Sequence, residues 1–503
     1  MIARTALSRA LPRAAASSTS CRAAAASRVA IPRTAAAALS TSTALASSNS
    51  SRTNPLRTAA SSISNALSGA LDASSPALTE FDPHAVTAMD KQEPPAPGAD
   101  FNVVIVGAGN INFGEMTTVP TAMTAAARAE LTFPCLQALT KVHGTTVSVS
   151  SSDKLGPRLK VTALIDPSAA RANKVLGVKR NSFVLSAYKD TVVYPNIEAY
   201  FKNLDPAKKP HAIWVGSPPA FRGQEREGRD LEKKLIEYFP DVALFIEKPV
   251  STGPVEEAFS IAEKLKKAGT TASVGYMLRY LKVVQKMKQI LEENNLKVMA
   301  TNARYIMAYE HTAKPDWWDK SQTCGPIVEQ ATHFCDLSRY FGGEVDLSTV
   351  MAHSLEHFEP AGKLSRMPID ESKIPAEQRI PRITCATWKY ESGAVGSLTH
   401  AVALQGHNYS TELDVYADGY QLRLVDPYNA PVLYFRRPGD DHEEVVRYQN
   451  DDPFFSEVAN LIDVIENGPG AAPLLSTYED AAKTYALTWA IRLASEKSAK
   501  KPE

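Results

Sequence analysis

The chain lacks several features that would assign it to a distinct class of protein. Its 503 residues include only five cysteines, and none of them shows the C-x-x-C spacing, so the sequence predicts neither a metal site nor a disulfide framework. Such cysteine use is typical of a reducing compartment. Since no apolar run reaches the ~18 residues that span a bilayer, we expect no membrane partner. The 55 basic and 55 acidic residues cancel, which argues against a nucleic-acid partner.

The first 71 residues contain no aspartate, glutamate or lysine, although they carry eight arginines and many alanines and serines. This composition is typical of organellar transit peptides, because acidic residues oppose import across an energised membrane. The alternative is a low-complexity tail without a targeting role, since such a composition cannot form a core. We therefore expect a transit-peptide-like, disordered segment over residues 1–98 and a mitochondrial location, with the cytoplasm as the alternative.

A glycine-rich turn follows the first apolar run of the remaining chain. Gly107 would allow the tight turn, and Gly109 would let the backbone approach a pyrophosphate closely. We predict that these glycines, together with Asn110 and Ile111, bind a dinucleotide. Asn112 stands where the usual fingerprint has its third glycine, so the motif is incomplete, and a glycine turn without a cofactor is the alternative.

Residues 115–153 interrupt this pattern with a stretch rich in threonine, alanine and serine. It shows no continuous amphipathic face, and a long structureless segment is unusual inside a compact unit. Two interpretations remain open. The stretch is either a surface insertion or sequence that the working protein lacks.

Two further apolar runs predict strands that end in candidate cofactor residues. The run 159–165 is followed by Asp166, which in a dinucleotide fold would bind the adenosine ribose hydroxyls and favour NAD over NADP. The run 211–216 is followed by Ser217 and Pro218, where the backbone could lie along the cofactor. A simple Asp-Pro turn is the alternative for Asp166, but it does not explain the strand before it.

A fourth apolar run, residues 242–246, ends in Glu247, Lys248 and Pro249. Open α/β sheets bind ligands at the carboxyl ends of their strands, so we predict that Glu247 contacts the cofactor and Lys248 the substrate. The alternative is a charged strand end that only solvates a loop. Because these strands alternate with helical patterns, we expect a doubly wound parallel sheet over 99–249.

Five short motifs occur in order along the chain, namely GAGNINFG, LIDP, SPPAFRG, EKPV and VGYMLRY. Together they resemble the glucose-fructose oxidoreductase / inositol dehydrogenase family of NAD(P)-dependent oxidoreductases. The resemblance runs from residue 102 to the C-terminus, apart from 115–153. It implies a Rossmann domain, a cis Lys248–Pro249 bond, and a second α+β domain whose largely antiparallel open sheet mediates dimerisation.

The second half predicts helices followed by several strands. Residues 254–269 have an apolar helical face between a starting proline and a closing glycine, and residues 299–309 alternate as a half-buried strand. Ser476 with Glu479 predicts a capping box for the last helix. We expect an α+β substrate-binding and dimerisation domain over 250–503.

The spacing of Glu329, His333 and Asp336 predicts neighbouring positions on one helix. An imidazole with a pKa near neutrality is a natural acceptor for an alcohol proton, so we predict His333 as the general base. Lys248 would then hydrogen-bond the same substrate oxygen. Glu329 is a candidate catalytic residue, but the related family usually carries aspartate there, so its role stays open. A structural histidine is the alternative.

These patterns favour an oxidoreductase that acts on CH–OH groups and moves hydride between a sugar or polyol carbon and NAD. Two alternatives use the same fold: a non-catalytic NAD(P)-binding sensor, and a redox-neutral lyase or hydrolase that retains its NAD. A third alternative, a product of a faulty gene model, is suggested only by residues 115–153. We expect a homo-oligomer, either a dimer or a tetramer. The pair Trp317–Trp318 either lines a sugar pocket or belongs to the core.

Overall fold

The computed structural model describes residues 98–113, 147–182, 184–468, 470 and 472–499. The predicted transit-peptide-like segment before residue 98, and residues 115–146 of the predicted insertion, lie outside these residues. Among the residues that are described, no helix is long and apolar enough to cross a membrane.

The first sheet has six parallel strands in the order β3-β2-β1-β4-β5-β6. Four of the strands are almost continuously buried, because helices cover both faces of the sheet. This confirms the predicted doubly wound sheet. The strand bounds are β1 Phe101–Val106, β2 Leu159–Ile165, β3 Val192–Tyr194, β4 Ala212–Val215, β5 Ala243–Ile246 and β6 Ala272–Val274. Since β6 belongs to this sheet, the predicted domain boundary at residue 249 falls too early.

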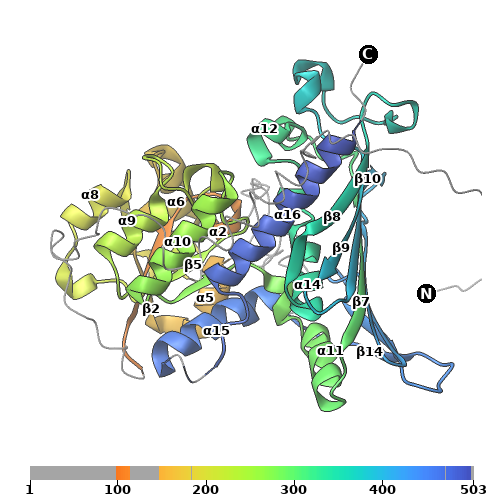
Figure 1. The fold of residues 1–503 in the computed structure, drawn as a ribbon. Helices are drawn as coiled ribbons and strands as arrows, with labels where there is room; N and C mark the ends of the chain where they lie inside the picture. Colours follow the sequence, from red (N-terminus) through yellow and green to blue (C-terminus); the bar gives the residue numbers. More distant parts are fainter. Residues whose placement is uncertain (1–97, 114–146, 183, 469, 471, 500–503) are drawn as a thin grey trace, which may run out of the picture. The chain divides into compact units, whose positions relative to one another are not determined.

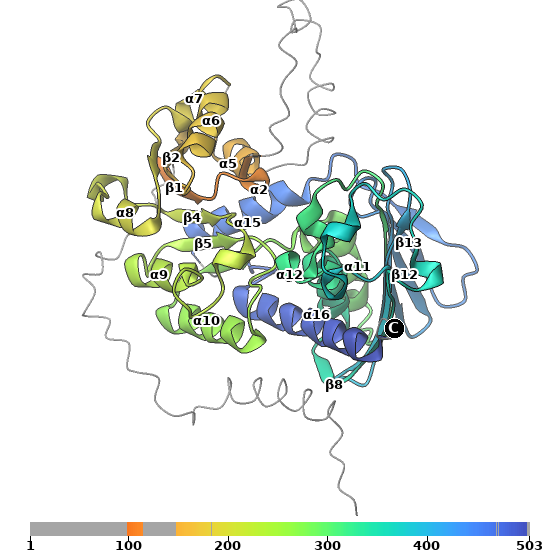
Figure 2. The same ribbon diagram turned by 90° about the horizontal axis from the view of Figure 1, so that it is seen from above.

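Helices from both ends of the chain cover the first sheet. One face packs against α9, α10 and α16, and the other against α5, α6, α7 and α15. The last helix, α16, lies beside both α10 and β8 of the second sheet (Figure 1, Figure 2). These helices span α5 Val147–Leu155, α6 Ala169–Arg180, α7 Leu185–Tyr188, α9 Leu231–Tyr238, α10 Val255–Ala268, α15 Pro453–Asn467 and α16 Tyr478–Ser498, while α8 covers Ile197–Lys202.

Helix α5 corrects the end of the predicted irregular segment. Residues 147–153 were expected to lack regular structure, yet they form most of this helix. Its Ser150 and Ser151 are fully buried, and Lys154 Nζ pairs with Asp463 of α15 at 2.6 Å. The helix is held by these tertiary contacts rather than by an amphipathic sequence, which is why periodicity did not reveal it.

The second sheet has eight strands in the order β14-β13-β12-β11-β7-β10-β9-β8. Only β7 and β10 pair in parallel, so the sheet is largely antiparallel, as predicted. One face packs against α11 and α14. The elements are α11 Lys282–Glu293, β7 Val298–Ala308, α14 Thr332–Gly342, β8 Val345–Leu355, β9 Ile383–Tyr390, β10 Val395–Leu404, β11 Ser410–Ala417, β12 Tyr420–Val425, β13 Val432–Arg436 and β14 Glu444–Val446.

Three local expectations were wrong in detail. Met299 was expected on the buried side of β7, but it is 61% exposed because it lies at the start of the strand. The sequence predicts a helix over about residues 225–238, but α9 begins only at Leu231. The cap of α16 is Thr477, whose side chain accepts a hydrogen bond from the Asp480 N–H, whereas Ser476 Oγ donates to the Val274 carbonyl.

The side chain of Asn112 replaces the missing third glycine of the fingerprint. It is buried, and its Nδ2 donates to the carbonyls of Gly107 at 2.7 Å and Val106 at 3.2 Å. Gly216, just after β4, makes room for it, since a Cβ there would come within 2.5 Å of Asn112 Nδ2. The ends of β1 and β4 are therefore joined through one amide side chain.

Substitution Gly216→Ala should destabilise the protein by about 1–3 kcal/mol, because Asn112 would have to move and lose its two hydrogen bonds. The matched control is Gly177→Ala in α6, where a Cβ meets nothing within 4 Å. That change should raise the free energy of unfolding by roughly 0.5–1 kcal/mol. Urea denaturation of the two variants measures both effects. Equal stability of the two variants would contradict the packing described for Asn112.

Candidate active site

The glycine turn after β1 brings three strand ends together. Gly107 has φ +97°, and a Cβ there would lie 2.9 Å from the Ser217 nitrogen. Its N–H donates to the Ile165 carbonyl at the end of β2 at 2.8 Å. Around Gly109, by contrast, a Cβ would meet no atom of the described residues within 4 Å. At Gly107 the turn therefore packs closely against the sheet. At Gly109 it leaves the space that a pyrophosphate requires.

The residues next to Gly109 form the short helix α2, Asn110–Phe113. The structure therefore places Asn110 and Ile111 directly after the open glycine. Their side chains lie outside the described part of the structure.

Asp166 follows β2 and lies against the glycine turn. Its Oδ2 accepts a hydrogen bond from the Ala108 N–H, its Oδ1 accepts one from the Ser168 N–H, and Arg171 donates to both oxygens. Burial alone would raise the pKa of Asp166, but the hydrogen bonds from Arg171 and the two N–H groups lower it below its ordinary value. Asp166 is therefore held as a carboxylate beside the dinucleotide turn.

Ser217 and Pro218 lie after β4 on the other side of the same turn. Pro218 is exposed, whereas the hydroxyl of Ser217 is buried and has no hydrogen-bond partner among the described residues. A buried hydroxyl without a partner is costly unless a ligand or water satisfies it. Together with the space at Gly109, this hydroxyl fits a dinucleotide cofactor.

Glu247, Lys248 and Pro249 follow β5, and the Lys248–Pro249 bond is cis, as predicted. Lys248 Nζ donates to the carbonyl of Glu329 at 2.8 Å and lies 3.6 Å from its Oε1. The Glu247 carboxylate lies against Gly275, where a Cβ would come within 2.9 Å of it. Burial raises the pKa of Glu247 to about 6.

His333 lies in the first turn of α14. The prediction of one continuous helix was wrong, because helix α13, Pro326–Glu329, ends before Gln330 and α14 begins at Thr332. The break lets the Glu329 carbonyl face Lys248 instead of a helical N–H. Burial and the charge of Lys248 hold the pKa of His333 well below its ordinary value, so the near-neutral pKa expected from the sequence is not found. Its Nδ1 has no hydrogen-bond partner among the described residues.

The structure joins Glu329 to an aromatic residue whose role was open. Trp317 Nε1 donates to Glu329 Oε2 at 3.1 Å, so Trp317 belongs to the site. Trp318 is fully buried and donates to the Thr312 carbonyl at 2.9 Å, which makes it a core residue. The two members of the predicted pair thus have different roles.

Sequence reasoning missed two tyrosines of the site. The Tyr276 hydroxyl lies 2.8 Å from Thr332 Oγ1, and its ring centroid is 5.9 Å from that of His333. The Tyr428 ring lies 6.1 Å from His333. Tyr276 stands within the motif VGYMLRY and could have been noticed, whereas Tyr428 follows β12 in a loop without a recognisable signal.

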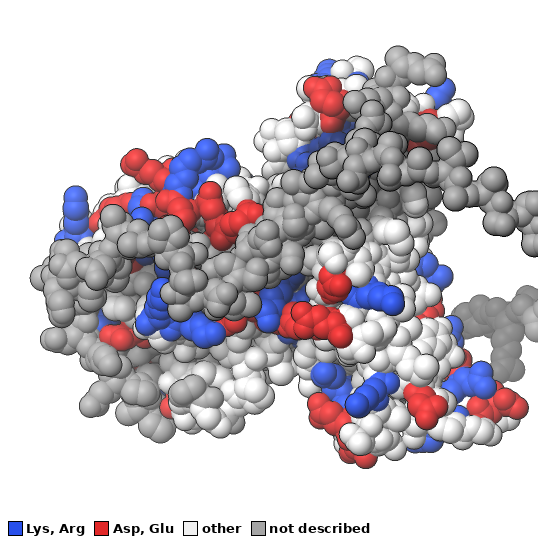
Figure 3. Space-filling model, viewed as in Figure 1, with Lys and Arg blue, Asp and Glu red and all other residues white. Residues whose placement is uncertain are grey.

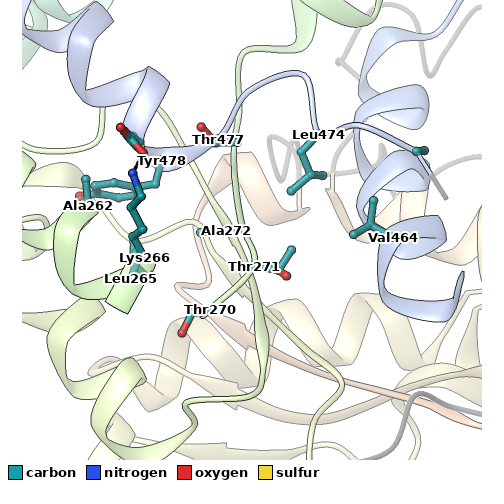
Figure 4. Close-up of a pocket in the computed structure, with 12 residues that line it drawn as sticks. Ala262, Leu265, Lys266, Thr270, Thr271, Ala272, Val464, Leu474, Thr477 and Tyr478 are labelled. Carbon is teal, nitrogen blue, oxygen red and sulfur yellow. Dashed lines mark hydrogen bonds and ion pairs between the residues drawn. The ribbon is translucent and has the colours of Figure 1, made fainter. Parts of the chain in front are cut away.

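Other features of the described residues lie apart from this site. A pocket of about 290 Å³ beside α10, β6 and α16 is lined by residues such as Leu265, Ala272 and Tyr478 (Figure 4), and none of its residues belongs to the site above.

No group of three metal-ligating side chains is found in the described part of the chain. Acidic and basic side chains are intermixed on the described part of the face shown in Figure 3.

Comparison with protein families matches both halves of the chain. Residues 101–276 match the Gfo/Idh/MocA model, described as an oxidoreductase family with an NAD-binding Rossmann fold, and residues 279–420 match an oxidoreductase C-terminal domain. The chain belongs to this family. The first match ends just after β6 and so agrees with the sheet described here rather than with a boundary at residue 249.

The chain is also similar to a curated relative in sequence and to solved structures in fold. An uncharacterised protein of Schizosaccharomyces pombe, UNK4.17, is 45% identical over 406 residues, which cover 80% of this chain and 93% of the relative. The UDP-N-acetylglucosamine 3-dehydrogenase GnnA of Acidithiobacillus ferrooxidans shares the fold with a TM-score of 0.54 at 14% identity, covering 79% and 99% of the two chains. The 3-ketoreductase KijD10 of Actinomadura kijaniata gives 0.52 at 14%, covering 79% and 98%.

Substitution Gly109→Val should weaken NADH binding at least ~10-fold, because the side chain would occupy the open space of the turn. The free energy of unfolding should change by less than about 0.5 kcal/mol, since nothing lies within 4 Å of the new Cβ. NADH fluorescence titration measures the affinity, with Gly177→Ala as the control that should bind normally. Unchanged affinity in Gly109→Val would place the cofactor elsewhere.

Proposed function

We propose that the protein is an oxidoreductase that moves hydride between a sugar or polyol CH–OH carbon and a nicotinamide. The observation that carries this proposal is the contact of Lys248, at the carboxyl end of β5, with Glu329, which lies four residues before His333. The dinucleotide turn of Gly107 and Gly109 lies on the same edge. Lys248 and His333, one from each half of the chain, would then transfer the proton beside the bound cofactor.

His333 would act as the general base. Because burial and Lys248 keep its imidazole neutral near pH 7, a ring nitrogen is free to accept the hydroxyl proton of the substrate. Lys248 would donate a hydrogen bond to the same oxygen and stabilise the negative charge that develops there. The bound nicotinamide supplies the hydride acceptor.

The remaining walls of the site suit a neutral polyhydroxylated substrate. Trp317 and Tyr428 offer ring faces and edges, to which the C–H groups of a sugar can pack. The Glu329 carboxylate can accept hydrogen bonds from hydroxyl groups. The similarity in fold to a UDP-N-acetylglucosamine 3-dehydrogenase supports a sugar as the substrate class.

Substitution Lys248→Met should lower turnover by about 10²–10³-fold, because the substrate oxygen loses its charged donor. NADH affinity should stay within roughly threefold of the parent, since Lys248 contacts Glu329 rather than the glycine turn. The assay follows cofactor reduction across a panel of sugars and polyols.

The matched control for this experiment is Lys264→Met in α10, which removes a lysine that pairs with Glu225 at 2.6 Å. It should leave turnover unchanged. Binding of NADH without cofactor reduction by the parent, on every member of the panel, would favour a cofactor-binding sensor. Product formation without net reduction would favour a redox-neutral enzyme.

We also propose NAD as the preferred cofactor, because the Asp166 carboxylate would hydrogen-bond a ribose 2′-hydroxyl and repel a 2′-phosphate. NADH should bind at least ~10-fold tighter than NADPH. Asp166→Ala should reduce this preference by freeing the guanidinium of Arg171, which the carboxylate now holds at 2.8 Å. Parallel NADH and NADPH titrations check this, and tighter NADPH binding by the parent would refute it. KijD10 was crystallised with NADP, so both cofactors occur among proteins of this fold.

A further inference from the structure

Arg222 is a fully buried arginine that contacts the two loops carrying Ser217 and Lys248. Its guanidinium donates three hydrogen bonds to backbone carbonyls: Nε to Ser217 at 2.9 Å, Nη1 to Val250 at 3.0 Å, and Nη2 to Glu247. All three carbonyls belong to the loops that follow β4 and β5. The Ser217 carbonyl lies on the cofactor side of the candidate site. The carbonyls of Glu247 and Val250 lie before and after the Lys248–Pro249 unit.

The two loops lie backbone against backbone at this point. Gly223 has φ +72°, and a Cβ there would come within 2.1 Å of the Val250 carbonyl oxygen. Only glycine fits, because the conformation and the contact both exclude a side chain. Arg222, the neighbouring residue, supplies the hydrogen bonds that hold the loops at this separation.

The counterion of Arg222 is Glu232 of α9, which is also fully buried. Arg222 Nη1 lies 3.8 Å from Glu232 Oε1, and Glu232 Oε2 accepts the Gly223 N–H at 2.6 Å. Burying an ion pair costs desolvation, and apolar residues of similar volume often stabilise a fold as well or better. A gain in stability therefore does not explain why Arg222 and Glu232 are both buried.

We propose that Arg222 is a positioning residue, which fixes Lys248 relative to the cofactor loop at Ser217. This role rests on the proposed function of Lys248. The guanidinium binds the chain on both sides of the Lys248–Pro249 unit, so the base of the lysine side chain is held at both flanks. The same guanidinium also binds the carbonyl of Ser217. One planar group of donors therefore holds both the substrate side and the cofactor side of the site.

Arginine suits this role better than lysine. Its five N–H donors are arranged in a rigid plane, so one side chain reaches three carbonyls in fixed directions. A lysine could retain the charge next to Glu232 but not the three directed hydrogen bonds. The conservative change Arg222→Lys therefore separates charge from geometry.

The experiment compares Arg222→Met with the double variant Arg222→Met/Glu232→Gln. The single variant leaves the Glu232 charge buried without its partner, so its melting temperature should fall. The double variant removes the charge but keeps an oxygen that accepts the Gly223 N–H. Its melting temperature should rise above that of Arg222→Met but stay below that of the parent, because the three carbonyls still lack their donor.

The positioning role predicts that turnover does not recover with stability. In the double variant kcat should stay about 10–100-fold below the parent while KM changes less than about threefold, since a displacement of Lys248 affects the transition state most. Recovery of kcat together with the melting temperature would overturn the proposal and leave Arg222 a purely structural role.

The matched control is Arg180→Met, because Arg180 also holds backbone carbonyls, those of Tyr188 at 3.1 Å and Thr191 at 2.7 Å. These carbonyls lie near β3, at the edge of the sheet away from Lys248. Arg180→Met should lower the melting temperature and leave kcat unchanged. A loss of kcat equal to that of the Arg222 double variant would contradict a specific role of Arg222.

A second readout needs no substrate. Amide hydrogen exchange, followed by mass spectrometry, should become faster over residues 217–223 and 247–253 in the double variant and stay unchanged in the second sheet. Unchanged exchange in both loops would overturn the proposal even if the substrate were never found. If hydrogen exchange becomes faster in both loops but the parent protein reduces no cofactor, the proposed function fails. The conclusion that Arg222 holds the two loops then remains.

Discussion

The close approach of backbone segments at the carboxyl edge of the first sheet is the constraint on which the site depends. Gly107 lies against Ser217, Gly216 against Asn112, and Gly275 against Glu247. At each position a Cβ would come within 3 Å of its neighbour, so the loops after β1, β4, β5 and β6 can nest only because these residues are glycines. The cofactor turn and Lys248 consequently lie on the same edge of the sheet, on either side of the loop that follows β4.

The second half of the chain is tied to this edge by a buried ionic network. Arg279, just after β6, pairs with Asp336 of α14 and with Asp480 of α16, and Thr484 also donates to Asp336. Asp336 lies one turn after His333 on the same helix. The position of the imidazole relative to the first sheet is therefore set by charged groups that are paired with one another, which is the condition under which buried charges are tolerated.

Local patterns predicted those parts of the molecule that depend on neighbours in sequence. Gly107, Asp166 and Lys248 each follow an apolar run, and the structure places all three at strand ends, where such runs should lead. The break between Glu329 and His333 was not predictable, because residues 330–331 leave the helix to satisfy contacts with distant strands. Tyr428 and Arg222 were missed for the same reason, since their partners lie far along the chain or on another element.

Lys248 and His333, the two side chains of the proposed chemistry, are thus each held by a buried arginine. The arginine contacts the backbone or the helix that carries the side chain and not the side chain itself. Arg222 binds the carbonyls around Lys248, and Arg279 binds the helix of His333. Neither guanidinium contributes to the aromatic wall of Trp317 and Tyr428. That wall is nevertheless coupled to the chemistry, because Trp317 donates to the Glu329 carboxylate, which lies 3.6 Å from Lys248 Nζ. The Tyr428 ring likewise lies 6.1 Å from that of His333, so a substitution in the wall that changes which substrate fits can also shift the lysine or the imidazole.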